Sequence, residues 1–359
     1  MKKLIAFLLV LTMGIALCAC GSTSAPAATE APAATKAPAE APTEAAAQEA
    51  APEYNEITLK FGTSSAETSL TAKAFMDWGT RLSEATDGKV KVDVYCSSVL
   101  GNNTEMTQGA QMGTIDVVVI QPSGLADMGA KKMSALVLPY LFENYDQYYN
   151  TLMGDIGESL LQDVTDNIDG LIGFGYMPDG GRCYFNNGKA ITTIDDIKGM
   201  KLRVQSYAID SSTAEAIGFS ATPTALSELY SALQSGVVDG AEQPLSAIDG
   251  NAFYEVVDYL VLDNHTYNMP TLVMSEKTWN SLNDETRSLL KEKWIETVED
   301  FFQPALADYE AGLIEKFKAA GVEVVELSDY DKWVEAVAPV WAEYGAGLED
   351  IVAKIQALA

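Results

Sequence analysis

The sequence predicts an α/β protein with two lobes, and three observations support this fold class. Short apolar runs typical of strands alternate with stretches of helical spacing along most of the chain. The part from Tyr54 to Ala359 is long enough for two lobes rather than one. An apolar stripe at helical spacing from Leu290 to Phe317 indicates one long helix that lies across both lobes.

The first 20 residues have the layout of a secretory signal. Two lysines precede an apolar run from Leu4 to Leu17, which is too short for a mature membrane span. The four residues that end at Cys20 resemble a bacterial lipobox, whose last cysteine is lipidated after cleavage. We therefore expect a lipoprotein signal peptide at 1–20 with Cys20 as the lipidation site, and a plain signal peptide is the alternative.

Residues 21–53 consist mostly of Ala, Pro, Thr, Glu and Ser, with almost no large apolar side chain. Such a segment cannot bury a core, so we expect a disordered tether. The whole chain carries a formal net charge of −28. This charge argues against nucleic-acid binding and against adsorption onto anionic lipid, which leaves the lipid anchor as the expected membrane contact.

The first sheet is expected directly after the tether. Ile57, Leu59 and Phe61 alternate with polar residues as in a half-buried strand, and helical spacing follows. The run from Ile115 to Ile120 is apolar on both faces, which is typical of a buried parallel strand. In order, we expect strands at 57–61, 90–94 and 115–120, and helices at 70–82 and 104–112.

The same alternation continues through the second half. Gly218 and Gly236 mark helix ends, because glycine readily adopts the backbone that terminates a helix. Pro304 interrupts the long apolar stripe and is expected to kink that helix. In order, we expect a helix at 145–164, strands at 171–174 and 202–204, and helices at 209–217 and 227–234.

Ligands of open parallel sheets bind beyond the carboxyl ends of the strands, and in two lobes these ends face each other across a cleft. The residues directly after the expected strands are therefore candidates for a binding site. They are 63–65, 95–103, 121–123, 176–184, 203–207 and 242–244.

Signals for an enzyme are weak. The single histidine argues against a multi-histidine zinc site, and neither a Walker-type loop nor a Gly-x-Ser-x-Gly elbow is present. Gly173 and Gly175 follow a strand but lack the third glycine of a dinucleotide loop. The many carboxylates are most simply explained as surface residues. We expect no catalytic residue, no metal and no cofactor.

Cys96 and Cys183 are the two cysteines of the folded part, and nothing in the sequence brings them together. Free thiols are the expected state, and a disulfide is the alternative.

The chain has four arginines, and two of them fall at the expected cleft. Arg81 and Arg287 lie on polar faces of expected helices, whereas Arg182 and Arg203 lie in or after strand-like runs. A guanidinium offers paired donors that match a carboxylate and keeps its charge at neutral pH. Each of these two arginines is therefore a candidate carboxylate ligand or one half of a buried ion pair.

The sequence resembles the solute receptors of tripartite ATP-independent periplasmic (TRAP) transporters, in the dicarboxylate/sialate receptor family. The resemblance extends from Thr58 to about Leu290. Its marks are Leu100-Gly101, Glu105-Met106, Gly113-Thr114-Ile115-Asp116, Leu138-Pro139-Tyr140-Leu141-Phe142, Gly181-Arg182, the run from Lys198 to Val204, Thr222-Pro223-Thr224, the run from Glu228 to Pro244, and Phe253-Tyr254-Glu255-Val256.

The resemblance implies roles for individual residues. Arg203 matches the arginine that pairs with the carboxylate of the solute, and Arg182 matches a second arginine near it. Gln243 takes the place of an amide that orients the solute, where many relatives have asparagine. The other residues expected to bind solute are Asn103, Gln121, Ser64, Ser206, Tyr207, Tyr267 and Leu226.

Uncharged residues replace the charged groups that sialate receptors use. Asn103, Gln121 and Gly124 are at these positions, and Ser64 replaces an amide, which argues against sialic acid. The resemblance instead implies a smaller sugar acid, hydroxy acid or dicarboxylate. Its carbons could lie on Tyr184, Tyr207 or Tyr267.

The expected protein is a monomeric receptor on the extracytoplasmic face of the cell membrane, with a periplasmic-binding-protein-like fold that closes at a hinge. Lobe I is expected at 54–179 plus 269–308, and lobe II with the C-terminal helices at 180–268 plus 309–359. Its expected partners are a small organic acid and the membrane permease subunits of a TRAP transporter. The alternatives are a receptor of an ATP-driven importer and a lipid-anchored glycan hydrolase.

Overall fold

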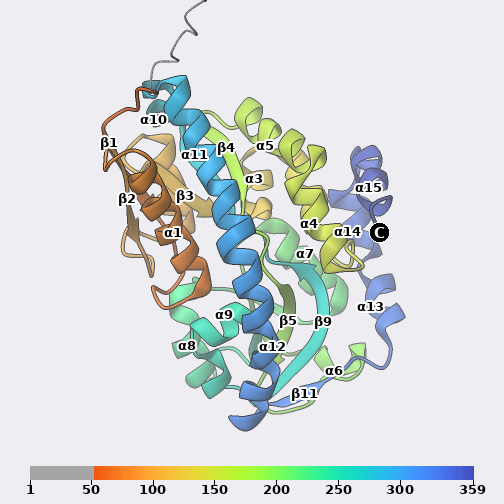
Figure 1. The fold of residues 1–359 in the computed structure, drawn as a ribbon. Coiled ribbons are helices and arrows are strands. Elements are labelled where there is room, and N and C mark those ends of the chain that lie inside the picture. Colours follow the sequence, from red (N-terminus) through yellow and green to blue (C-terminus); the bar gives the residue numbers. More distant parts are fainter. Residues whose placement is uncertain (1–51) are drawn as a thin grey trace, which may run out of the picture. The chain divides into compact units, whose positions relative to one another are not determined.

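The computed structural model describes residues 52–359 and shows two mixed sheets surrounded by helices, which confirms the expected α/β class (Figure 1). The signal peptide, Cys20 and nearly all of the expected tether lie outside the described residues. Within 52–359, no helix is both long and apolar enough to cross a membrane.

The first sheet has five strands in the order β2-β1-β3-β10-β4. β1 (Ile57–Gly62) pairs in parallel with both β2 (Val90–Tyr95) and β3 (Val117–Ile120). β10 (Thr271–Ser275) comes from much later in the chain and lies antiparallel between β3 and β4 (Leu171–Tyr176). The first sheet is therefore mixed, because this late strand enters it from the opposite end.

The second sheet has six strands in the order β11-β9-β5-β8-β6-β7. β6 is parallel to β7 and to β8, whereas β5 is antiparallel to β8 and to β9. We call the part built on the first sheet lobe I and the part built on the second sheet lobe II. The strands of lobe II are β5 (Gly181–Asn186), β6 (Lys201–Val204), β7 (Ser220–Pro223), β8 (Gly240–Pro244), β9 (Tyr259–Tyr267) and β11 (Glu323–Val325).

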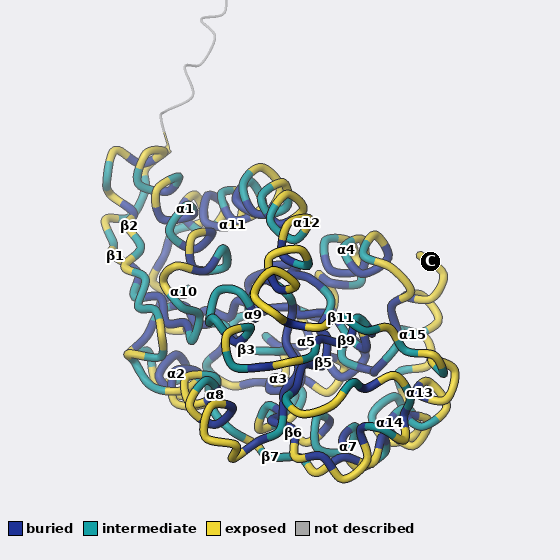
Figure 2. The backbone as a smooth tube through the Cα atoms, turned by 90° about the horizontal axis from the view of Figure 1, so that it is seen from below, coloured by how far each residue is buried: buried dark blue, intermediate teal, exposed yellow. Residues whose placement is uncertain are grey.

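Helices cover both sheets, and buried residues gather along the strands while exposed residues occupy the outer turns (Figure 2). The α-helices are α1 (Leu70–Ala85), α2 (Asn103–Gln111), α3 (Pro122–Met128), α4 (Tyr145–Met153), α5 (Asp155–Asn167), α6 (Ile194–Ile197), α7 (Ala208–Ile217), α8 (Leu226–Gln234), α9 (Leu245–Gly250), α10 (Glu276–Ser281), α11 (Asp284–Glu296), α12 (Gln303–Ala319), α13 (Tyr330–Ala336), α14 (Ala338–Tyr344) and α15 (Glu349–Gln356). Short 3₁₀ segments occur at Lys131–Val137 and Phe253–Glu255.

The single helix expected at 145–164 is two helices. Gly154 has extended backbone dihedrals and separates α4 from α5, so the apolar spacing continues although the helix does not. Asp155 and Glu158 then occupy the first turn of α5, where acidic side chains interact favourably with the helix dipole.

The long C-terminal helix continues through Pro304. A π-helical segment, Thr297–Phe302, joins α11 to α12 directly before this proline, which lacks the N–H that a regular turn would use. Leu290 and Trp294 pack in the core of lobe I, and Leu313 and Phe317 pack in the core of lobe II. Figure 1 shows α11 and α12 in line alongside both sheets.

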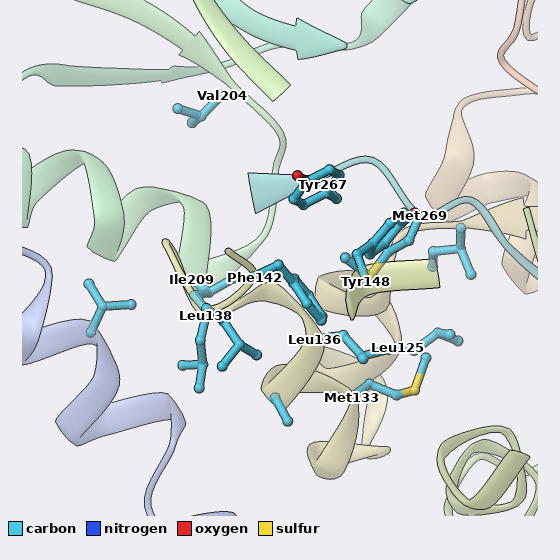
Figure 3. Close-up of a cluster of buried hydrophobic side chains, with 14 of the residues drawn as sticks. Leu125, Met133, Leu136, Leu138, Phe142, Tyr148, Val204, Ile209, Tyr267 and Met269 are labelled. Carbon is cyan, nitrogen blue, oxygen red and sulfur yellow. The ribbon is translucent and has the colours of Figure 1, made fainter. Parts of the chain in front are cut away.

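The lobes are also joined by the short links between β4 and β5 and between β9 and β10. On the side of α4 and α7, one apolar cluster includes residues of both lobes, among them Leu136, Phe142, Ile209 and Tyr267 (Figure 3). The expected lobe boundaries after residues 179, 268 and 308 stay a prediction.

Trp78 connects α1 to α11 at the centre of the lobe I core. Its side chain is fully buried, its Nε1 donates to the backbone oxygen of Leu290 at 3.1 Å, and its ring centroid is 5.9 Å from that of Trp294. We predict that Trp78→Ala lowers the free energy of unfolding by about 3–5 kcal/mol in a urea titration. Ile295→Ala, on the exposed side of α11, should change the free energy of unfolding by less than about 0.5 kcal/mol. Equal losses in the two variants would contradict this packing.

Candidate ligand-binding site

A cavity of about 490 Å³ lies between the lobes and is lined by residues that follow the parallel strands or begin the next helices. Because the carboxyl ends of these strands point toward it, the fold gathers side chains from distant parts of the sequence. The expected site residues that line this cavity are Ser64, Asn103, Gln121, Arg182, Arg203, Ser206, Tyr207, Leu226 and Gln243.

Tyr267 and Tyr184 do not line this cavity, and the expectation that their rings contact the solute stays a prediction. Tyr267 stacks on Tyr148 in the apolar cluster of Figure 3, with ring centroids 4.6 Å apart. Tyr184 stacks on His265 with ring centroids 4.3 Å apart. Both rings border a smaller neighbouring cavity of about 40 Å³ instead. Of the three expected tyrosines, Tyr207 is the one on the wall of the large cavity.

Arg203 is buried at the cavity wall and leaves part of its guanidinium unpaired. It lies near the end of β6 and is 4% exposed. Its Nε donates to the backbone oxygen of Thr224 at 2.9 Å. Within 52–359, the buried Nη1 has no hydrogen-bond partner, and Arg203 forms no salt bridge with an acid. The guanidinium is thus bonded to the protein through Nε, and its two terminal nitrogens are available to a ligand.

Each of the three side-chain nitrogens of Arg182 donates to a protein group. Arg182 forms a buried ion pair with Glu242: Nε donates to one carboxylate oxygen and Nη2 donates to the other at 2.7 Å. Nη2 also donates to the backbone oxygen of Glu242 at 3.2 Å, and Nη1 donates to Oδ1 of Asn268 at 2.8 Å. Of the two possibilities left open for Arg182, the structure therefore shows the buried ion pair.

The ion pair orients an amide network on the cavity wall. Since Arg182 only donates, it requires that Oδ1 of Asn268 is the atom that faces it. The same Oδ1 accepts from Nε2 of Gln121 at 2.9 Å, and Nδ2 of Asn268 donates to Asp179 at 2.8 Å. Asp179 also accepts from the hydroxyl of Ser246 at 2.8 Å. The orientation of the Gln121 amide is therefore set by its neighbours.

Asp179 and Glu242 lie within the candidate ranges 176–184 and 242–244, but sequence reasoning assigned a role to neither of them, and it missed Asn268. Arg182 is opposite Pro244 in the β5–β8 register, so Glu242 lies diagonally from Arg182 on the same face of the sheet. The alternation of β8 would have placed Glu242 on this face, but only once the register was known.

Burial and neighbouring charges shift several pKa values at the site. Burial, with help from Arg182, lowers the pKa of Arg203 to about 10, so Arg203 is still cationic at neutral pH. Burial raises the pKa of Glu242, but the charges and hydrogen bonds of Arg182 and His265 together outweigh burial and lower the pKa to about 2. Burial, together with the charge of Glu242, raises the pKa of Asp210 to about 7. The ion pair thus stays charged while Asp210 can be partly protonated.

The expected free thiols are confirmed, since Cys96 and Cys183 are both free. Within the described residues, no cluster of His, Cys, Asp and Glu side chains could hold a metal ion.

Comparison with known proteins gives a family match and many relatives. The family described as bacterial extracellular solute-binding protein, family 7 (DctP), matches residues 61–347. The sialic acid-binding periplasmic protein SiaP of Vibrio cholerae is 28% identical over 302 residues, which are 84% of this chain and 92% of that protein. The C4-dicarboxylate-binding periplasmic protein DctP of Rhodobacter capsulatus is 28% identical over 273 residues, which are 75% and 81% of the two chains.

Solved structures of TRAP periplasmic solute-binding proteins have the same fold. One from Xanthobacter autotrophicus, with bound β-D-galacturonate, has a TM-score of 0.79 and 26% identity over 83% of this chain and 99% of its own. One from Polaromonas, bound to D-erythronate, has a TM-score of 0.78 and 29% identity over 84% and 99%. One from Sulfurospirillum deleyianum, with bound succinate, has a TM-score of 0.78 and 26% identity over 85% and 100%.

His265 lies between two acids, which affect the pKa of its imidazole. Its Nδ1 is 2.8 Å from Oδ2 of Asp263, and its Nε2 is 3.7 Å from Oε2 of Glu242. Burial lowers the pKa of His265, but the two acids together have the larger effect and raise the pKa to about 9. Because the folded-state pKa exceeds the unfolded value, protonation of His265 stabilises the fold below pH 6.5, and this contribution is lost as the pH rises through 9.

As His265 is the only histidine of the chain, its imidazole can be titrated by NMR without mutation. We predict half-protonation near pH 9 in the folded protein. A midpoint at or below pH 6.5 would show that the two acids do not hold a charged imidazole.

Proposed function

The chain belongs to the family of bacterial extracellular solute-binding proteins, family 7, and on this premise we propose that it captures a small organic acid through Arg203 and delivers it to a TRAP-type membrane permease. Proteins of this family are receptors, not enzymes. The proposed solute is held between the two lobes and released unchanged, so no bond is made or broken.

The main support for this proposal is that the terminal nitrogens of the Arg203 guanidinium are not paired with a protein acid. A buried cation without a partner is costly, whereas an anionic ligand that accepts from both terminal nitrogens would compensate this cost. Solved relatives were crystallised with galacturonate, erythronate or succinate, each of which carries a carboxylate. The amide of Gln243 also supports the proposal, because it is buried at the cavity wall and forms no side-chain hydrogen bond within 52–359.

Closure of the lobes would strengthen this interaction. Tyr207 of lobe II packs against Gly124 of lobe I, where an added Cβ would lie 2.7 Å from the ring. The backbone N–H of Ala208 donates to Asp127 across the same boundary at 3.0 Å. Excluding water lowers the local dielectric and favours the ion pair, while desolvation of both charges limits the gain. We expect a dissociation constant in the micromolar range, about −8 kcal/mol.

The family match does not favour the two alternatives, a receptor of an ATP-driven importer and a lipid-anchored glycan hydrolase. Deep burial of Glu242 in an ion pair and the saturated hydrogen bonding of Asp179 also argue against a catalytic carboxylate pair here. We propose a monomeric receptor, anchored by lipid at Cys20 on the extracytoplasmic face of the cell membrane.

We predict that Arg203→Ala weakens binding of an organic acid by about 2–5 kcal/mol, because the carboxylate is left without its charged partner. Arg203→Lys should also weaken binding, since one ammonium group cannot reproduce two planar donors. Isothermal titration calorimetry with the most stabilising acid from a thermal-shift panel measures both effects. Arg287→Lys, a change at a partly exposed arginine on α11, is the matched control and should leave the affinity unchanged. Unchanged affinity in Arg203→Lys would contradict the two-donor arrangement.

The lipid anchor leads to a separate prediction. Cys20→Ala should move the protein from the membrane fraction to the soluble fraction and should prevent lipid labelling in the native bacterium. Cys96→Ala, which leaves the lipobox intact, is the control. A wild-type protein that carries no lipid would rule out the anchor without affecting the proposal about Arg203.

A further inference from the structure

The charged side chains that line the cavity allow a narrower description of its ligand. They are Glu105, Asp179, Arg182, Arg203 and Glu228, and no lysine or histidine of the described residues lines it. Arg182 is already neutralised by Glu242. Arg203 is thus the one cation on this wall that has no acid paired with it.

A second ligand carboxylate would meet acidic rather than basic groups. Asp179 is 1% exposed on the cavity wall, and the more exposed Glu105 and Glu228 lie at the starts of α2 and α8. These two glutamates occupy first helical turns, where they already interact with the N-terminal dipoles. A dianion would therefore gain one favourable ion pair and would be repelled by the remaining carboxylates.

The neutral groups of the wall include acceptors that require a donor. Gln121 must direct its Nε2 toward Asn268, whose Oδ1 is fixed by Arg182, so Oε1 of Gln121 is an acceptor without a donor among residues 52–359. Oδ1 of Asn103 is buried and has no partner within the described residues. Ionised carboxylates only accept hydrogen bonds, whereas hydroxyl groups also donate. A ligand with hydroxyl groups can satisfy these acceptors, and a simple dicarboxylate cannot.

We propose that the solute is a polyhydroxy monocarboxylate, such as a uronic or aldonic acid, with its carboxylate at Arg203 and its hydroxyls at Gln121 and Asn103. This assignment rests on the proposed receptor function and narrows its ligand class. Gln121 is then a residue that determines specificity, because its fixed Oε1 distinguishes a hydroxyl from a second carboxylate.

The test compares ligands matched in size that differ in the number of carboxylates. D-Galacturonate, D-galactarate and D-galactose carry one, two and no carboxylates on the same six-carbon frame, and D-erythronate and succinate form a second, four-carbon pair. Thermal shift followed by calorimetry at pH 7 measures binding to the wild-type protein. The expected result is that at least one monocarboxylate binds at least 10-fold more tightly than its diacid and neutral counterparts.

Two variants distinguish a failure of the monocarboxylate assignment from a failure of the proposed receptor function. Gln121→Met removes the acceptor at similar length and should weaken binding of the sugar acid at least 10-fold, and Arg203→Ala should weaken binding of every acid. Tighter binding of galactarate or succinate, still lost in Arg203→Ala, would overturn the monocarboxylate assignment and leave the receptor function intact. Stabilisation by none of the acids, or binding that is indifferent to Arg203→Ala, would instead contradict the proposed function itself.

Discussion

The buried ion pair between Arg182 and Glu242 determines which groups the cavity can offer to a ligand. It neutralises one of the two cleft arginines and leaves Arg203 as the arginine of the cavity wall without an acid partner among residues 52–359. It also fixes the amide of Asn268, and through it the amide of Gln121. Breaking such a pair would leave a buried charge, so the arrangement of the cavity wall depends on both partners being present.

The fold explains why these residues meet. Parallel strands in both lobes end at the cavity, and the short links between β4 and β5 and between β9 and β10 carry Asp179 and Asn268 to its wall. The continuous helix from α11 to α12 and the shared apolar cluster of Figure 3 connect the lobes away from this opening. We propose that movement of the lobes changes the exposure of the cavity.

Local patterns in the sequence predicted much of the fold, because the alternation of apolar and polar residues and the helical spacing of apolar residues indicate which side chains face a core. They predicted the first three strands and the cleft position of Arg203, which lies near the end of a parallel strand. They could not predict that β10 enters the first sheet antiparallel, since this pairing depends on contacts more than a hundred residues away in the chain. Local patterns also could not predict that Tyr267 stacks on Tyr148, which depends on tertiary packing, or that Glu242 lies beside Arg182, which depends on strand register.

The most direct test of the central claim is a crystal structure of the protein with a bound organic acid. We predict that both oxygens of the ligand carboxylate lie within hydrogen-bond distance of the terminal nitrogens of Arg203, while Arg182 keeps its contacts with Glu242. A structure in which Arg203 pairs with a protein acid and the solute carboxylate lies elsewhere would contradict it.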